Sequence, residues 1–152
     1  MNNPKKIDLS IIILNFNTNV YLERLLDSLK KAKTDNYKIE TIVVDNASKD
    51  DSLQMLKTKF PRIQVIANKK NLGFSQGINQ GIRKARGENI LILNSDTLIF
   101  KDTLVAMISF MGNHRNFAAA TCRLELKDGI LDSSCHRGFP TPWAALTYFL
   151  GL

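Results

Sequence analysis

Residues 9–93 contain short apolar runs rich in Ile, Leu and Val, and polar residues follow them. The runs cover residues 9–14, 39–44, 63–67 and 90–93. Segments with apolar residues at helical spacing separate the runs, at 21–29, 53–60 and 78–85, and a further helix is expected to begin at Asp102 or Thr103. The Asn and Thr residues just before the first of these helices, Thr18 among them, are expected to supply its N-cap, and Gly87 is expected to end the third. Parallel strands need a crossover connection, which is usually a helix. The alternation therefore predicts an α/β fold, a mostly parallel sheet flanked by helices.

The run 90–93 has the composition of a strand buried on both faces, as in the centre of a parallel sheet. It ends at Asn94, Ser95 and Asp96, and the first two runs end in the same way at polar residues, Asn15 and Asp45. Ligands of open α/β sheets bind at the carboxyl ends of the strands. A single Asp after a strand is more often a turn or capping residue. A ligand site is indicated because three strands are expected to bring such polar ends together.

The composition, with 44% hydrophobic and 23% charged residues, is typical of an ordinary soluble globular protein. The net charge of +7 favours anionic partners. The basic residues are spread along the chain and the aromatic residues form no stacking cluster, so we expect no nucleic-acid partner. Cys122 and Cys135 lack the spacing of a zinc site. With no secretory signal and no apolar run of about 20 residues, we expect a cytoplasmic protein.

Two common nucleotide sites are excluded by the glycine pattern. A Rossmann dinucleotide site needs its glycine fingerprint directly after the first strand, where the chain has Asn15, Phe16 and Asn17 instead. Gly73, Gly77 and Gly81 come later and at a different spacing. The sequence also lacks the GxxxxGK[ST] motif of a P-loop.

The alternation of strand and helix patterns ends beyond Asn116. Residues 117–126 have the pattern of a strand, Asp128 and Gly129 form a hairpin-turn pair, and residues 130–139 are expected to return as a strand or a loop. No linker or internal repeat interrupts the chain. We therefore expect a single domain over residues 1–152, with a β-hairpin region at its carboxyl-terminal end.

Motifs at these strand ends resemble those of family 2 glycosyltransferases, which have the GT-A fold. The motifs occur at 11–17, 43–50, 71–79 and 91–97, and the resemblance covers about residues 8–142. It is greatest to the rhamnosyltransferase-like branch, which tends to carry Asn-x-Asp-Thr at the position of 94–97. The resemblance implies transfer of a sugar from a nucleotide diphosphate sugar, a dTDP- or UDP-sugar, to a glycan or lipid-linked acceptor hydroxyl, with inversion.

The resemblance also implies roles for individual residues. Asp45 would accept a hydrogen bond from the imide N–H of uracil or thymine, and Lys69 or Lys70 would offset phosphate charge. Gly73 and Gly77 would let the backbone approach the donor closely. The full set of implied nucleotide-binding residues is Leu14, Asn15, Phe16, Asp45, Asn71, Gly73, Phe74, Gly77, Asn79, Asn94 and Ser95.

Asp96 is the implied metal ligand, for Mg²⁺ or Mn²⁺ bridging the two phosphates of the donor. Since Asn94 stands where other branches carry a first Asp, the protein would supply one carboxylate. This is ordinary for Mg²⁺, which is often held through one carboxylate, waters and substrate phosphates. By analogy with relatives that extend cell-surface or lipid-linked glycans, peripheral contact with the inner face of the membrane is also expected.

The general base that the family places downstream of the metal ligand is not apparent in this chain. The carboxylates Glu125, Asp128 and Asp132 fall in the expected hairpin, and the apolar residues 143–152 follow without an acidic motif. His136 and Arg137 are weaker candidates for contact with the donor or acceptor. We therefore expect a domain truncated at its carboxyl terminus. The alternatives are a catalytically incomplete nucleotide-binding or interaction module of the same fold and, less favoured, a general polyanion binder.

Overall fold

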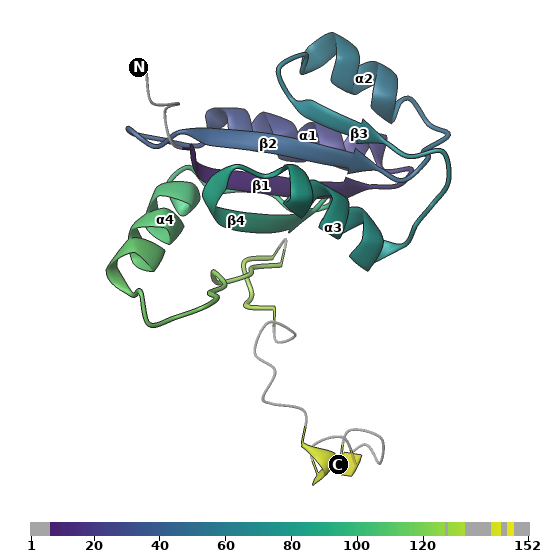
Figure 1. Cartoon of the computed structure of the whole chain (residues 1–152). Coiled ribbons are helices and arrows are strands. Elements are labelled where there is room, and N and C mark those ends of the chain that lie inside the picture. Colours follow the sequence, from purple (N-terminus) through teal and green to yellow (C-terminus); the bar gives the residue numbers. More distant parts are fainter. Residues whose placement is uncertain (1–6, 127, 133–140, 144–145, 148–152) are drawn as a thin grey trace. The chain divides into compact units, whose positions relative to one another are not determined.

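The computed structural model describes residues 7–126, 128–132, 141–143 and 146–147. It divides into two compact units, Met1–Ala118 and Ala119–Leu152, and each is described by itself. The first unit alternates strands and helices along the chain, as the sequence predicts (Figure 1). Its elements are β1 (Ile7–Asn15), α1 (Asn19–Lys31), β2 (Ile39–Asp45), α2 (Ser52–Lys59), β3 (Gln64–Ala67), α3 (Phe74–Lys84), β4 (Gly87–Asn94) and α4 (Thr103–Asn113).

The strands form one four-stranded sheet in the order β3-β2-β1-β4, and all neighbouring strands are parallel. The predicted parallel sheet is thus confirmed. Its register places Asn15 beside Asp45 and Leu14 beside Asn94. The polar ends of β1, β2 and β4 therefore meet at one end of the sheet, which we call the carboxyl edge.

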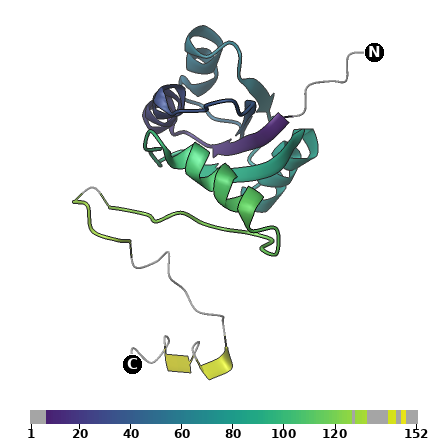
Figure 2. The same ribbon diagram turned by 90° about the vertical axis from the view of Figure 1, so that its left-hand side faces the viewer.

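Helices cover both faces of this sheet (Figures 1 and 2). On one face, odd-numbered residues of β1 such as Ile11 and Ile13 pack with buried residues of α1, α2 and α4. On the other face, Ile12 and Ile42 pack against Ile78 of α3. β1 lies in the interior of the sheet and its residues from Leu9 to Ile13 are all buried. No helix among the described residues combines the length and apolarity needed to cross a membrane.

The expectation that residues 90–93 form a strand buried on both faces is wrong for this structure. β4 lies at one end of the strand order, and burial alternates along it. Ile90 and Ile92 remain 44% and 45% exposed, whereas Leu91 and Leu93 pack against the core. The physical reason is that, among the described residues, β4 pairs with β1 alone, and no described helix covers Ile90 and Ile92 on the α3 face.

Within the described residues, the expected hairpin region forms one isolated bridge. Glu125 and Leu131 form a single antiparallel bridge, and the Leu126 N–H donates to the carbonyl oxygen of Ile130 at 2.8 Å. The predicted strand over 117–126 is not formed. Of the expected return segment, residues 133–139 lie outside the described residues, as do His136 and Arg137.

Three helix boundaries test the sequence interpretation. The predicted start of the last helix is confirmed, with Asp102 as N-cap and Thr103 as first residue. Thr18 occupies the N-cap of α1, but its side chain makes no capping hydrogen bond. Gly87 is not the stop of α3, which ends at Lys84 with Ala85 as C-cap; Gly87 instead begins β4. A Cβ on Gly87 would lie 2.4 Å from the backbone nitrogen of Ser10, so close strand packing requires this glycine.

A polar cluster ties the strands together at the end opposite the carboxyl edge. The fully buried Ser10 hydroxyl donates to the Glu40 carboxylate at 2.6 Å and accepts from the Gly87 N–H at 2.8 Å. Arg86 donates to the same carboxylate through its backbone N–H and its guanidinium, each at 2.7 Å. Burial alone would raise the pKa of Glu40, but the hydrogen bonds from Ser10 and Arg86 outweigh it and lower the pKa below its ordinary value.

Replacing Gly81 by Ala is expected to destabilise the first unit. A Cβ at Gly81 would lie 2.4 Å from Cγ2 of Ile12, in the buried layer between α3 and the sheet. Overpacking of this kind typically costs about 1–3 kcal/mol. Gly112 is the matched control, because nothing lies within 4 Å of its added Cβ, and Gly112→Ala should stabilise the helix by up to about 1 kcal/mol. Urea unfolding of both variants measures the difference; equal effects would contradict the close packing.

Replacing Glu40 by Gln should lower the free energy of unfolding at neutral pH by about 1 kcal/mol, the usual net contribution of one intramolecular hydrogen bond. The folded-state pKa is lowered, so this stabilisation is fully present above the ordinary value of 4.5 and is lost as the pH falls through the folded-state pKa. Urea unfolding from pH 7 to pH 3 measures it. Asp27→Asn, which removes an exposed carboxylate, is the control. A Glu40→Gln deficit that persists unchanged at pH 3 would contradict the assignment.

Candidate functional site

The centre of the carboxyl edge is a buried pair formed by Asn15 and Asp45. Both side chains have no exposed surface, and they are direct neighbours across β1 and β2. The Asn15 Nδ2 group donates to Asp45 Oδ1 at 2.7 Å and to the Ser48 hydroxyl oxygen at 3.0 Å. The Ser48 N–H donates to the other oxygen, Asp45 Oδ2, at 2.9 Å. The pair therefore fixes the loop that follows β2 against the end of β1.

A second hydrogen-bonded link joins β1 to the turn after β4. The Thr18 hydroxyl donates to Asn15 Oδ1 at 2.6 Å, and it shares a 2.9 Å hydrogen bond with the hydroxyl of Ser95. Ser95 is 9% exposed, and the next residue, Asp96, is exposed. The side chain of Thr18, the N-cap residue of α1, thus holds the turn that carries Asp96.

A third link fixes the loop before α3. The Asn46 side chain is 1% exposed, and its Nδ2 group donates to Asn71 Oδ1 at 3.2 Å and to the carbonyl oxygen of Gly73 at 3.1 Å. Asn46 Oδ1 accepts from Asn68 Nδ2 at 2.9 Å, and Asn68 also pairs with Gln80 of α3. All four motif segments are therefore joined at one edge of the sheet.

Two residues at this edge have backbone angles that non-glycine residues seldom adopt. Ala47 has φ 65° and Asn17 has φ 55°. The Asn17 N–H donates to the Ser48 hydroxyl oxygen at 2.9 Å, and the Lys49 N–H donates to Asn17 Oδ1 at 2.7 Å. An Ala in the left-handed region costs about 1–2 kcal/mol, and such strain persists where surrounding contacts enforce it.

Asp50 caps the start of α1 from the neighbouring loop. Its Oδ2 accepts from the Asn19 N–H at 2.9 Å, and its Oδ1 accepts from the Ser52 N–H at 3.1 Å. Partial burial would raise the pKa of Asp50, but hydrogen bonds from Ser52 and from the Asn19 backbone outweigh it and lower the pKa. A carboxylate at a helix N-terminus is favourable for the helix as well.

The candidate residues divide into a buried set and an exposed set. Asn15, Asp45 and Ser95 are buried and hydrogen-bonded to neighbouring protein groups. Phe16 and Phe74 are 45% and 56% exposed. The other candidates with surface open to a ligand, fully or in part, are Leu14, Asn71, Gly73, Asn79, Asn94 and Asp96. The buried set can position the edge, and the exposed set can contact a bound molecule.

The two candidate glycines, Gly73 and Gly77, are required at their positions for different physical reasons. Gly73 is the N-cap of α3 with φ 77° and ψ 178°, a conformation that is essentially restricted to glycine. Gly77 is buried, and a Cβ there would lie 2.4 Å from Cδ1 of Leu14. The missing side chain of Gly77 faces Leu14 of β1 and permits close packing of α3, and the expected close approach of a ligand at Gly77 stays a prediction.

The surroundings of Asp45 bear on its expected contact with a nucleobase. Each carboxylate oxygen already accepts one hydrogen bond, and the residue has no exposed surface. A carboxylate oxygen can accept a further bond, but a base could reach this unexposed carboxylate only if the surrounding residues moved. The contact stays a prediction, and the observed bonds give Asp45 a positioning role at this edge.

Asp96 is the residue to test against a divalent cation. It is exposed, and the described residues provide it with no hydrogen bond or ion pair. The described part of the chain also contains no cluster of three or more His, Cys, Asp or Glu side chains. One free carboxylate cannot complete the coordination of a divalent cation by itself. It is suited to Mg²⁺ or Mn²⁺ that is also coordinated by phosphates and waters.

Sequence reasoning missed three residues of this edge: Thr18, Ser48 and Asn68. Thr18 was expected only as a helix cap, although its hydroxyl bridges Asn15 and Ser95. Ser48 lies inside a recognised motif, and its position directly after Asp45 and Asn46 was the available signal. Asn68 had no signal in the sequence, because its partners Asn46 and Gln80 are distant along the chain.

Comparison with known proteins identifies the family of this chain. The profile of the family described as Glycosyl transferase family 2 matches residues 10–146. The uncharacterized glycosyltransferase YfnE of Bacillus subtilis is 36% identical over 110 residues, which cover 70% of this chain and 28% of YfnE. The poly(ribitol-phosphate) beta-N-acetylglucosaminyltransferase TarS of Staphylococcus aureus is 31% identical over 117 residues, 70% of this chain and 19% of TarS.

Solved structures agree with the sequence comparison. The structure of S. aureus TarS 1-349 in complex with UDP-GlcNAc has a TM-score of 0.66 and 29% identity, covering 72% of this chain and 32% of that one. The mannosyltransferase PcManGT from Pyrobaculum calidifontis, in complex with GDP-Man and Mn²⁺, has a TM-score of 0.62 and 23% identity, covering 70% and 32%. The latter shows similarity of fold alone.

The chain thus spans less than a third of the length of YfnE and TarS. The matched part includes β1 from Ser10 onward, all of β2, β3 and β4, and the hydrogen-bonded carboxyl edge. With a profile match over most of its length, this chain belongs to glycosyl transferase family 2 and has its GT-A type of α/β fold.

Proposed function

We propose that this chain forms the donor-binding part of a glycosyltransferase that takes its sugar from a nucleotide diphosphate sugar. The observation that carries the proposal is the joining of all four motif segments at the carboxyl edge, through Asn15, Thr18 and Asn46. Membership of the family supports it, as does the binding of UDP-GlcNAc by the similar TarS. We favour a uridine or thymidine diphosphate sugar as the donor.

The exposed residues of the edge supply the contacts in this proposal. Phe16 and Phe74 present apolar surface suited to a base or a ribose face. Asn71 and Asn79 supply amide groups able to donate and accept. Asn94 and Asp96 are the proposed contacts on the side of the donor's two phosphates. The buried Asn15, Asp45 and Ser95 hold these segments in place, with the base contact of Asp45 as a further proposed role.

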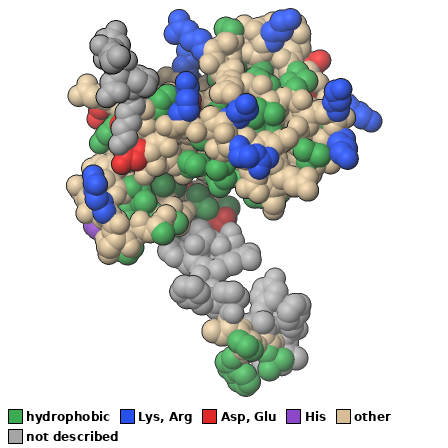
Figure 3. All heavy atoms as spheres, in the orientation of Figure 1, with side chains coloured by type: hydrophobic (Ala, Val, Ile, Leu, Met, Phe, Trp, Pro, Cys, Tyr) green, Lys and Arg blue, Asp and Glu red, His purple; other side chains and the backbone are tan. Residues whose placement is uncertain are grey.

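Charge favours a diphosphate at this edge. Lys69 and Lys70 lie in the exposed loop between β3 and α3, next to Asn71. Lys and Arg side chains of the described residues are otherwise dispersed over the face seen in Figure 3, without a single stripe. Asp96 is the residue that would hold Mg²⁺ or Mn²⁺ together with the phosphates. A bound divalent cation would supply charge neutralisation of the leaving diphosphate.

The proposed reaction forms a bond from the acceptor hydroxyl oxygen to the anomeric carbon and breaks the bond from that carbon to the diphosphate. The hydroxyl proton goes to a general base, which we do not assign to a residue. Inversion and hexosyl or rhamnosyl transfer are finer proposals of the same kind. TarS and the minor teichoic acid biosynthesis protein GgaB of B. subtilis, which is 30% identical over 112 residues, favour a cell-surface polymer as acceptor.

Nucleotide binding is the direct test of this proposal. Calorimetric titration of the chain with UDP and dTDP should show binding that strengthens with Mn²⁺. Asp96→Ala should remove the Mn²⁺-dependent part, which we expect to be at least about tenfold in affinity, or roughly 1.4 kcal/mol. Asp96→Asn should lose nearly as much, because the amide keeps the shape but not the charge.

Asp27→Asn is the matched control, since Asp27 is an exposed carboxylate on α1 away from the carboxyl edge. It should bind both nucleotides as the parent chain does. If a folded chain binds neither UDP nor dTDP, the proposed function is wrong and the inert interaction module becomes the better interpretation. Binding that is abolished by salt and indifferent to Asp96 would instead indicate a general polyanion binder.

The Thr18 hydroxyl is expected to matter for nucleotide affinity without touching the nucleotide. Thr18→Val removes the links to Asn15 and Ser95 but keeps the shape of the side chain. Loss of the hydrogen bond to Ser95, worth about 1 kcal/mol, should weaken Mn²⁺-dependent UDP binding roughly fivefold, because the turn bearing Asp96 is less well held. Thr18→Ser, which keeps the hydroxyl, should restore most of the affinity in the same titration. Equal affinities for the two variants would contradict the positioning role.

A further inference from the structure

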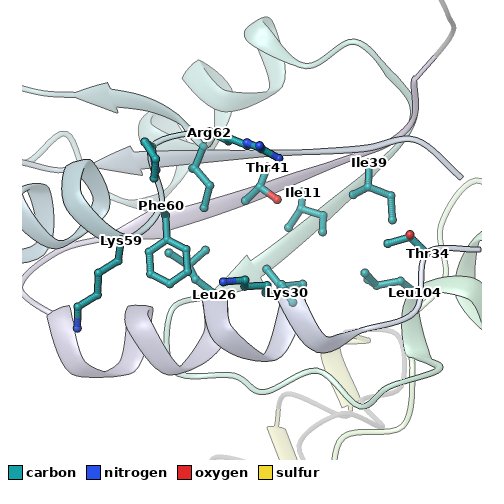
Figure 4. Close-up of a pocket in the computed structure, with 13 residues that line it drawn as sticks. Ile11, Leu26, Lys30, Thr34, Ile39, Thr41, Lys59, Phe60, Arg62 and Leu104 are labelled. Atoms are coloured by element: carbon teal, nitrogen blue, oxygen red, sulfur yellow. The ribbon is translucent and has the colours of Figure 1, made fainter.

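A pocket lies away from the carboxyl edge. This pocket, of about 470 Å³, opens between α1, α2 and the sheet, in the half of the first unit where the strands begin (Figure 4). It is bounded by the end of α1, by the connection from α2 to β3, and by Ile39 near the start of β2. Asn15, Asp45 and Asp96 do not line it, so the donor proposal leaves it without a role.

The walls of the pocket are mainly apolar. Ile11, Leu26 and Leu104 belong to the buried core, while Ile39, Phe60 and Ile63 are partly buried and pack against that core. Thr34 and Thr41 are the uncharged polar residues of the lining. Two hydroxyl groups are too few to replace the water around a sugar or a nucleobase, whose polar groups need partners when buried. The walls therefore suit an alkyl chain.

The charged residues of the lining are all basic: Lys30, Lys59 and Arg62. Lys59 is paired with Glu23 and extends away from the other lining residues (Figure 4). Lys30 and Arg62 are exposed, and the described residues offer neither of them an ion-pair partner. In Figure 4 Arg62 lies at the connection from α2 to β3 and Lys30 lies on α1, on opposite sides of the apolar residues. An apolar cavity with unpaired cations in its lining is complementary to a chain that ends in an anionic group.

We propose that this pocket binds a single-chain anionic amphiphile, with the alkyl chain among Leu26, Phe60 and Ile63 and the anionic head group between Lys30 and Arg62. The volume is within the range of small-molecule sites. The chain and the head group should both be required, because each part of the pocket matches one of them. This site is independent of the proposed donor site and could be occupied together with it.

Three probes separate the two requirements: dodecyl phosphate, dodecanol and inorganic phosphate. In calorimetric titration of the whole chain without metal, dodecyl phosphate should bind saturably below its micelle concentration. Dodecanol and phosphate should each bind at least roughly tenfold more weakly. In methyl NMR spectra, dodecyl phosphate should shift the signals of Leu26, Ile39 and Ile63 and leave Ile90 and Ile92 unchanged.

The double substitution Lys30→Gln and Arg62→Gln should weaken dodecyl phosphate binding at least roughly tenfold, without loss of fold because both side chains are exposed. The matched control is Lys57→Gln with Lys84→Gln, which removes two exposed charges outside the pocket. Equal loss in both double variants would reduce the effect to net charge and overturn the proposal. Binding only above the micelle concentration, or displacement by UDP, would also overturn it.

Discussion

The hydrogen bond between Asn15 and Asp45 is the interaction on which the organisation of the site depends. It joins the ends of the two most buried strands where neither side chain meets solvent. A buried carboxylate is costly unless its oxygens accept hydrogen bonds, and Asn15 and Ser48 supply them here. Removing either partner would leave charge or amide groups unsatisfied in a dry environment. The pair therefore fixes the geometry of the edge more strongly than a surface contact could.

From this pair the other links extend in order. Asn15 Oδ1 holds Thr18, Thr18 holds Ser95, and the residue beside Asp45, Asn46, holds the loop before α3. Apart from the local bond between Asn15 and Thr18, each bond connects segments that are distant in sequence, so the edge forms only once the sheet has its register. The rigidity of the sheet is thereby passed to exposed residues such as Asp96, which makes no hydrogen bond of its own to the described residues. That division suits a site in which free groups must already be in position when a ligand arrives.

The architecture was predictable because the hydrophobic pattern dictates it. Apolar runs alternating with helical spacing require a parallel sheet, and the structure confirms the strands within a few residues. The exposed face of β4 was not predictable, because Ile90 and Ile92 have the same apolar character as buried residues and only the strand order leaves them uncovered. The strand expected over 117–126 failed for a related reason: β propensity alone does not form a strand without a paired neighbour.

The candidate site was predictable as a location but less so in its details. Parallel strands bring their polar ends to one edge, which sequence order alone implies. Which polar residues face solvent depends on the side chains around them, and Asp45 and Asp96 illustrate this. Asp45 ends β2 and Asp96 follows β4, yet Asp45 is fully buried and Asp96 is exposed. The buried carboxylate is committed to protein hydrogen bonds, whereas the exposed one is available to a ligand. An acidic residue at a strand end therefore acquires its role from burial, and burial is a property of the fold and not of the motif.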